Sequence, residues 1–136
     1  MPSDKIKHFI CVMMENRSFD HMLGFLKSPN YQINGLNGNE QNPDNQNRPV
    51  KVTKDAAISG DLNPDPGHSF EDTAMQIFGF DPGTQPPPPP TMSGFVKNYF
   101  TKSKDAGRAA RIMKCLSPTT VPIITRLAQE YCVCDN

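Results

Sequence analysis

The sequence predicts an α/β fold in which apolar strands are connected by helices. Residues 6–14 form a nearly unbroken apolar run that ends abruptly at polar residues, which is typical of a strand buried on both faces of a parallel sheet. A second apolar run, Tyr131–Cys134, follows a stretch with helical periodicity. The order of strand, polar insert, helices and strand favours the α/β class.

Glu15 and Asn16 directly follow the first predicted strand, and a helix-like stretch, residues 19–27, comes next. Ligands of open α/β sheets bind beyond the carboxyl ends of the strands. Carboxylate and amide oxygens are also the ligands that hard divalent cations select. Both residues are therefore candidate metal ligands. The alternative is a helix cap, in which Asn16 or Ser18 accepts from free N–H groups and Glu15 lies in solvent.

Composition excludes several classes of protein. The length of 136 residues fits one domain. Its 14 basic and 14 acidic residues cancel, so neither a nucleic-acid partner nor general membrane-surface binding is indicated. We find no run of 18 apolar residues that would span a membrane. No signal peptide is visible either, so a cytoplasmic location is expected.

Residues 28–67 form a polar insert rich in Asn, Gln, Gly and Pro. Asn34-Gly35 and Asn37-Gly38 predict turns, and Val50–Thr53 predicts a short edge strand. A long insert of this kind is usually functional or disordered. Both interpretations stay open: a lid over the Glu15–Asn16 end of the sheet, or a disordered loop.

His68 lies immediately before a predicted helix. Ser69 is a good N-cap with Asp72 three residues later, and Gly79 ends the helical pattern. Free N–H groups and the helix dipole make a helix N-terminus favourable for anions, so His68 is a candidate site residue. The alternative is a histidine in a solvent-facing turn.

A proline-rich connector, residues 81–91, follows this helix. Pro86–Pro90 predicts a stiff polyproline II spacer, and a ligand for SH3 or WW domains is the alternative. Asp105–Leu116 is the next predicted helix. Its Arg108 and Arg111 share one face, which either meets phosphate or is solvated.

The last predicted helix opens at Ser117-Pro118 and leads into the second strand. Asp135 follows that strand, at the same sheet edge as Glu15 and Asn16 if the two strands are parallel. The helix has an apolar packing stripe formed by Ile123, Ile124, Leu127 and Ala128.

The four cysteines do not have the spacing of a zinc site, because paired C-x-x-C or Cys/His motifs are absent. We therefore expect free, buried thiols that behave as small apolar residues. The cysteines are Cys11, Cys115, Cys132 and Cys134.

The segment MMENRSFDHMLGFL resembles the N-terminal signature of the bacterial phosphoesterase family that contains non-haemolytic phospholipases C and related acid phosphatases. The departure is that Met22 and Leu23 stand between His21 and Gly24, where the family usually has one aromatic residue before the glycine. Three later segments are similar as well: the D-P-x-H-S segment at His68, MSGF, and YCVCD.

The resemblance implies an alkaline-phosphatase-like sheet with flanking helices, which is loop-rich and incomplete in this chain. It also implies metal-assisted hydrolysis of phosphate esters, with phospholipids among the candidate substrates. Glu15 and Asn16 would bind a divalent metal ion of unknown identity, and His68 would orient or protonate phosphate oxygens.

Family members place the Ser/Thr nucleophile shortly after the aspartate of the second strand, so we expect it beyond Asn136. Residues 1–136 are thus interpreted as the N-terminal fragment of a phosphoesterase domain, inactive when isolated. The alternatives are an inactive metal- or phosphate-binding remnant and an interaction module that uses the proline-rich connector.

Overall fold

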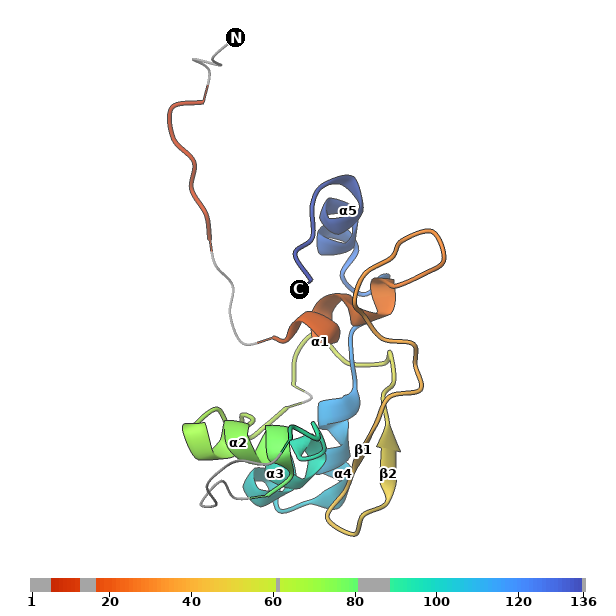
Figure 1. Cartoon of the computed structure of the whole chain (residues 1–136). Helices are drawn as coiled ribbons and strands as arrows, with labels where there is room; N and C mark the ends of the chain where they lie inside the picture. Colours follow the sequence, from red (N-terminus) through yellow and green to blue (C-terminus); the bar gives the residue numbers. More distant parts are fainter. Residues whose placement is uncertain (1–5, 13–16, 61, 81–88, 136) are drawn as a thin grey trace.

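The structure, a computed structural model, describes residues 6–12, 17–60, 62–80 and 89–135. These residues combine short helices with one small antiparallel sheet (Figure 1). The elements are α1 Phe19–Leu23, the 3-10 helix η1 Gly24–Leu26, β1 Gln41–Pro43, β2 Pro49–Lys51, α2 Phe70–Phe78, α3 Phe95–Ser103, α4 Ala106–Ala110, the 3-10 helix η2 Arg111–Met113 and α5 Pro122–Glu130. Mixed helix and strand content agrees with the α/β class at this coarse level.

The polar insert contains the sheet, so of the two alternatives the disordered loop is excluded. The lid over the Glu15–Asn16 end stays a prediction. Strands β1 and β2 pair antiparallel, with Asn42 opposite Val50. Asn42 is buried and links the hairpin to α3, because its side chain donates to the Met92 carbonyl (2.9 Å) and accepts from the Val96 amide (3.2 Å). A polar side chain that is fully hydrogen-bonded can be buried at little cost.

The core lies where α3, α4 and the hairpin meet. Val96, Tyr99 and Ala109 are almost completely buried there. Partly buried apolar side chains pack around them, namely Val50, Leu62, Phe100, Ile112 and Met113. Figure 1 places this packed unit, together with α2, in the lower half of the molecule.

The predicted first strand is not formed. Residues 6–12 have no regular secondary structure, and Phe9 and Ile10 are 88% and 86% exposed. The rest of the predicted strand, 13–14, lies outside the described residues. A strand needs neighbouring strands to bond its N–H and C=O groups and cover its apolar side chains. No strand in the described part of the chain pairs with this segment.

The second predicted strand is wrong for the same reason. Tyr131–Cys134 contains a bend but no strand, and Tyr131 is 78% exposed. The prediction of buried thiols also fails for three cysteines: Cys115 is buried, whereas Cys11, Cys132 and Cys134 are exposed. All four thiols are free, as expected.

The final helix, α5, starts later than predicted. A turn replaces its first residues, with the Thr120 amide bonded to the Ser117 carbonyl (2.9 Å), and Pro122 occupies the first helical turn. A helix that began at Pro118 would place Pro122 in its interior, where the ring clashes with the preceding turn. The predicted packing stripe is wrong in part, since only Ala128 of its four members is buried.

None of the helices in the described residues is long and apolar enough to cross a bilayer.

Candidate functional site

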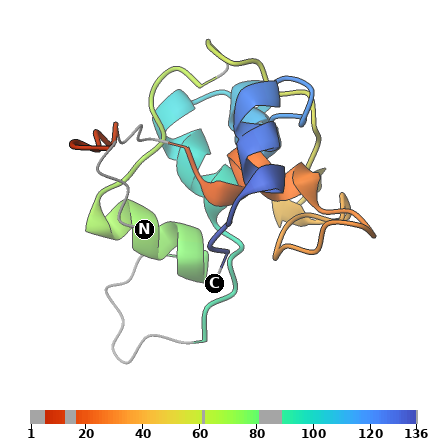
Figure 2. The ribbon, with the colours of Figure 1, turned by 90° about the horizontal axis from the view of Figure 1, so that it is seen from above.

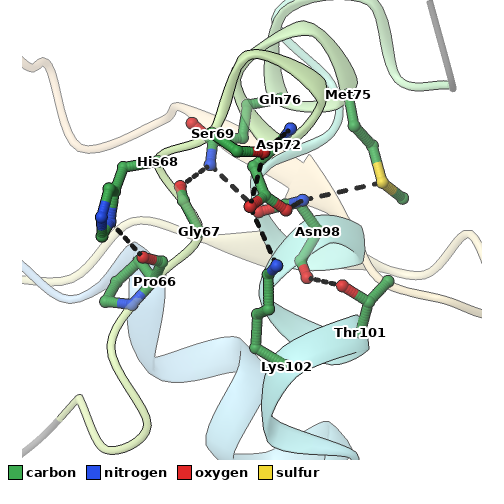
Figure 3. Close-up of polar contacts among 10 residues, drawn as sticks. All are labelled: Pro66, Gly67, His68, Ser69, Asp72, Met75, Gln76, Asn98, Thr101 and Lys102. Atoms are coloured by element: carbon green, nitrogen blue, oxygen red, sulfur yellow. Dashed lines mark hydrogen bonds and ion pairs between the residues drawn. The ribbon is translucent and has the colours of Figure 1, made fainter.

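The predicted site residues fall into two groups. Glu15 and Asn16 lie outside the residues that the structure describes. His68 is described and lies in the exposed loop that leads into α2 (Figure 3).

Local sequence signals determine the start and end of α2 as predicted. The Ser69 hydroxyl accepts from the Asp72 amide (3.1 Å), which is the expected N-cap. Gly79 ends the helix with φ +79°, and its amide bonds the Met75 carbonyl. Glycine adopts this left-handed conformation without the penalty that a Cβ atom brings.

The carboxylate of Asp72 is the centre of a polar network beneath the His68 loop. It accepts from Lys102 (2.9 Å), from Asn98 (2.8 Å) and from the Ser69 hydroxyl (3.1 Å). The hydrogen bonds from Lys102 and Asn98 lower the pKa of Asp72 to about 2. Asp72 is therefore ionised at neutral pH and links α2 to α3.

Asn98 and Gln76 attach the loop to these helices. The Gln76 amide donates to the Gly67 carbonyl (2.7 Å) and to the side-chain oxygen of Asn98 (3.0 Å). Asn98 is 2% exposed. A Cβ atom on Gly67 would lie 2.3 Å from the carboxyl carbon of Asp72, so only glycine fits at this close approach.

The residues before His68 are held by α3 and α4. The hydroxyl of Tyr99 donates to the Pro64 carbonyl (2.7 Å), and Arg108 donates to the Asn63 carbonyl (3.2 Å). Arg108, for which the sequence left a phosphate contact or a solvated face open, thus bonds the loop itself.

The His68 ring has a defined tautomer when it is neutral. Nδ1 lies 3.2 Å from the Pro66 carbonyl oxygen, which can only accept, so Nδ1 carries the proton. Nε2 then has a lone pair available for a proton or a metal ion. Figure 3 shows the ring on the opposite side of Ser69 from the Asp72 network.

The N-terminus of α2 already has negative charge. Glu71 and Asp72 both lie in its first turn, where carboxylates stabilise the positive end of the helix dipole. The imidazole of His68, rather than the helix dipole, is therefore the group available to meet an anion here.

A second histidine and an arginine were not singled out from the sequence. Arg17 donates to Nε2 of His21 (2.6 Å) and to the Ile58 carbonyl (3.1 Å), and His21 is buried. Arg17 lies just before the N-cap Ser18 of α1 and His21 lies inside the helix, so their closeness within the short segment RSFDH was the only available signal. The pair connects the segment after Asn16 to the insert.

Asp135 does not end a strand. Its carboxylate accepts from the Asn34 amide (2.6 Å), which joins the C-terminal segment to the insert. The predicted alignment with Glu15 and Asn16 depended on two parallel strands that end at one sheet edge, and neither residues 6–12 nor residues 131–134 form a strand, so this basis for it is lost.

No group of three or more His, Cys, Asp or Glu side chains in the described ranges could hold a metal ion. A shallow groove of about 820 Å³ lies elsewhere, between η1, the insert and the residues after β2. Phe25, Lys27 and Lys54 are among its lining residues, and His68 is not. The groove therefore does not define the site around His68.

The fold and site together define a mixed α/β protein. Its candidate site is a histidine at a helix N-terminus, in a loop that is held by hydrogen bonds from α2, α3 and α4. The chain belongs to the Phosphoesterase family, whose sequence pattern matches residues 6–136.

Three relatives from Arabidopsis thaliana are similar over 96% of the chain. Non-specific phospholipase C1 is 40% identical over 135 residues, non-specific phospholipase C6 is 40% identical over 133, and non-specific phospholipase C3 is 36% identical over 138. The chain spans about a quarter of their length (24%, 24% and 26%). No solved structure gives a significant match.

Proposed function

We propose that the chain forms part of a phosphoesterase that hydrolyses phosphate esters with the help of a divalent metal ion, as a phospholipase C-like phosphodiesterase. The observation that carries this proposal is the family match over residues 6–136. The names of the relatives favour a phospholipid substrate. An alkaline-phosphatase-like sheet, completed by sequence beyond that described, belongs to the same proposal.

Glu15 and Asn16 are the proposed metal ligands. One carboxylate and one amide oxygen match the preference of hard divalent cations, and further ligands are needed for a complete site. Such an ion neutralises charge on the phosphoryl group and activates a nucleophile. The hydrogen bonds of Arg17 to His21 and Ile58 would restrain the chain directly after these ligands.

His68 is the proposed proton carrier or orienting group at the phosphate. Its Nδ1–H is directed to the Pro66 carbonyl, which leaves Nε2 as the atom that meets a phosphate oxygen. When Nε2 is protonated it donates to that oxygen, and it can release the proton to the leaving group. Gln76, which is itself bonded to Asn98, donates a hydrogen bond to the loop backbone. This supports the role because it restricts the position of the backbone that carries His68.

The test is a chimera that joins all 136 residues to the remaining three-quarters of Arabidopsis non-specific phospholipase C1 in place of its own matched segment. We expect metal-dependent release of phosphorylated headgroup from phosphatidylcholine vesicles. His68→Ala should lower kcat by about 100-fold or more, the usual contribution of a general acid or base. Lys51→Ala, on the exposed hairpin, is the matched control and should leave kcat unchanged.

A soluble chromogenic phosphate monoester, assayed in parallel, separates a lipid-directed enzyme from a phosphatase. A folded chimera that hydrolyses neither substrate at any concentration of calcium or magnesium would show that the proposal is wrong.

Metal binding is testable on the 136-residue chain itself. Calcium or magnesium should raise its melting temperature, and Glu15→Ala should remove this rise. Stabilisation without a change on Glu15→Ala would assign the ion to other residues.

A further inference from the structure

The groove between η1, the insert and the residues after β2 is separate from the candidate site around His68. Figures 1 and 2 show η1 and the insert loop that follows it (orange) on the opposite side of the molecule from α2 (green). The volume of about 820 Å³ falls within the range of about 300–1,000 Å³ that is usual for small-molecule sites. The groove is therefore large enough for a ligand of its own.

The apolar part of the groove lining depends on two glycines. Leu36 packs against Gly24, where a Cβ atom would lie 2.8 Å from the leucine side chain, and the Leu36 amide bonds the Gly24 carbonyl (2.9 Å). The edge of the Phe25 ring lies 3.8 Å from the position of a Cβ atom on Gly38. Val52, which is 7% exposed, adds a third apolar side chain to the lining. Leu36 and Phe25 are only half-buried, so a ligand in the groove can cover more of their apolar surface.

The charged residues of the lining are two lysines. Among the described residues, no aspartate or glutamate lines the groove. Within the same part of the chain, Lys27 donates a single long hydrogen bond (3.4 Å), to the Gly35 carbonyl, and Lys54 makes no hydrogen bond or ion pair. Both ammonium groups are thus available to an anion.

The acidic side chains close to this lining in the sequence are bonded to other groups. Glu40 accepts from the amides of Asn37 (2.8 Å) and Gly38 (2.9 Å), and Asp55 forms an ion pair with Lys114 (2.7 Å). The groove therefore presents positive charge beside apolar surface. Complementarity of charge and polarity favours a ligand that has an anionic head and an apolar chain.

We propose that this groove binds an anionic amphiphile with one apolar chain and a phosphate monoester as its head group. The chain packs on the three apolar side chains of the lining, and the head group pairs with Lys27 and Lys54. Two lysine charges favour a doubly charged phosphate monoester over a singly charged carboxylate. This binding goes beyond the proposed hydrolysis, because it needs neither His68 nor a metal ion.

The test is isothermal titration calorimetry of the 136-residue chain with decyl phosphate, below the concentration at which it forms micelles and in the presence of EDTA. We expect saturable one-to-one binding. Decyltrimethylammonium has the same chain and the opposite charge, so it should not bind. Inorganic phosphate lacks the chain and should bind at least about tenfold more weakly, since burial of each CH₂ group contributes to affinity.

Substitutions of single lysines test the role of the groove. Lys27→Gln and Lys54→Gln should each weaken the binding of decyl phosphate by about fivefold or more, the factor that one ion pair contributes in open solvent. Lys104→Gln is the matched control. It removes the same charge at the exposed C-cap of α3, outside the groove, and should leave the affinity unchanged.

Amide chemical shifts in NMR spectra locate the ligand without any substitution. Decyl phosphate should shift the amides of Gly38 and Thr53, which line the groove, and leave the amide of Gly107 in α4 unchanged.

Equal affinity for decyl phosphate and decyltrimethylammonium would overturn the proposal. Equal effects of Lys54→Gln and Lys104→Gln would do so too, as would shift changes centred on Ser69 in place of the groove. Hydrolytic activity enters none of these readouts, so failure here and failure of the proposed enzyme function are distinguishable.

Discussion

Asn98 is the side chain on which the position of the His68 loop depends most. It is 2% exposed and bonds both Asp72 and Gln76, and Gln76 in turn bonds the loop backbone at Gly67. A buried amide in this position costs little only while its partners remain, because every lost hydrogen bond leaves a desolvated polar atom behind.

We therefore expect Asn98→Leu to destabilise the chain by about 1–3 kcal/mol. Leucine has the same branched skeleton as asparagine but cannot hydrogen-bond, so the loss reflects chiefly unpaired polar groups on Asp72 and Gln76. Urea unfolding followed by circular dichroism measures the effect. Asn39→Leu, at a position outside this network, is the control, and an equal loss in both variants would contradict the role of Asn98.

Asp72 makes stability sensitive to acid. Its pKa is about 2 in the folded chain and 3.8 ordinarily, so the unfolded chain binds the proton first as pH falls. The contribution of ionised Asp72 to the free energy of unfolding is fully present above about pH 4 and is lost as pH drops from 4 towards 2. Melting temperatures over this range should fall more for the wild type than for Asp72→Asn. Parallel curves for the two proteins would show that Asp72 does not contribute.

The four thiols should differ in reactivity. Burial raises the pKa of Cys115 to about 11, with a smaller effect from the carboxylates of Asp20 and Glu40. The thiolate is the reactive form, so Cys115 should resist a thiol reagent at pH 8 while three exposed cysteines react. Counting labelled thiols by mass spectrometry checks this. Labelling of Cys115 at the same rate as Cys132 would contradict its burial.

At the scale of elements, helices α2 and α3 approach each other closely at one glycine. A Cβ atom on Gly94 would lie 1.8 Å from the Met75 carbonyl oxygen, and the Gly94 amide bonds the Gln76 carbonyl (3.0 Å). The chain that enters α3 is therefore in direct backbone contact with the last turns of α2.

Gly94→Ala should lower the free energy of unfolding by about 1–3 kcal/mol, the usual range for overpacking. Gly107→Ala is the matched control inside α4, where a Cβ atom meets nothing closer than 3.4 Å. Alanine in place of Gly107 should raise the free energy of unfolding by roughly 0.5–1 kcal/mol. Thermal unfolding of both variants separates these outcomes, and a shift of the same sign in both would contradict the close contact.

At the scale of the whole molecule, stability is concentrated at one end. Val96 and Tyr99 in α3 are buried in the core, whereas residues 6–12 and the outer arc of α5 are exposed. Buried apolar contacts and protected hydrogen bonds determine which parts of a protein open last.

Native-state hydrogen exchange of the isolated chain should therefore be slowest at the amides of Asn98 and Tyr99, and fastest in residues 6–12. Uniform exchange across both regions would show that the chain lacks a cooperative core.

Local features of the fold were predictable because local chemistry determines them. Ser69 and Gly79 delimit α2 through bonds within a few residues, and the turn at Asn37-Gly38 has the expected positive φ at Gly38. The motif around Arg17–His21 was likewise sufficient to indicate the family. None of these inferences needed a contact between distant residues.

The sequence by itself thus determined the helices with clear caps, the family and the candidate role of His68. Only the tertiary structure decided which apolar runs are covered: residues 6–12 and 131–134 have strand-like sequences but no neighbouring strand among the described residues. It also decided that Asn42 and Asn98 are buried. The physical reason is the same in both cases, since strands and buried amides are stabilised by partners distant in sequence, which neither hydropathy nor local spacing reveals.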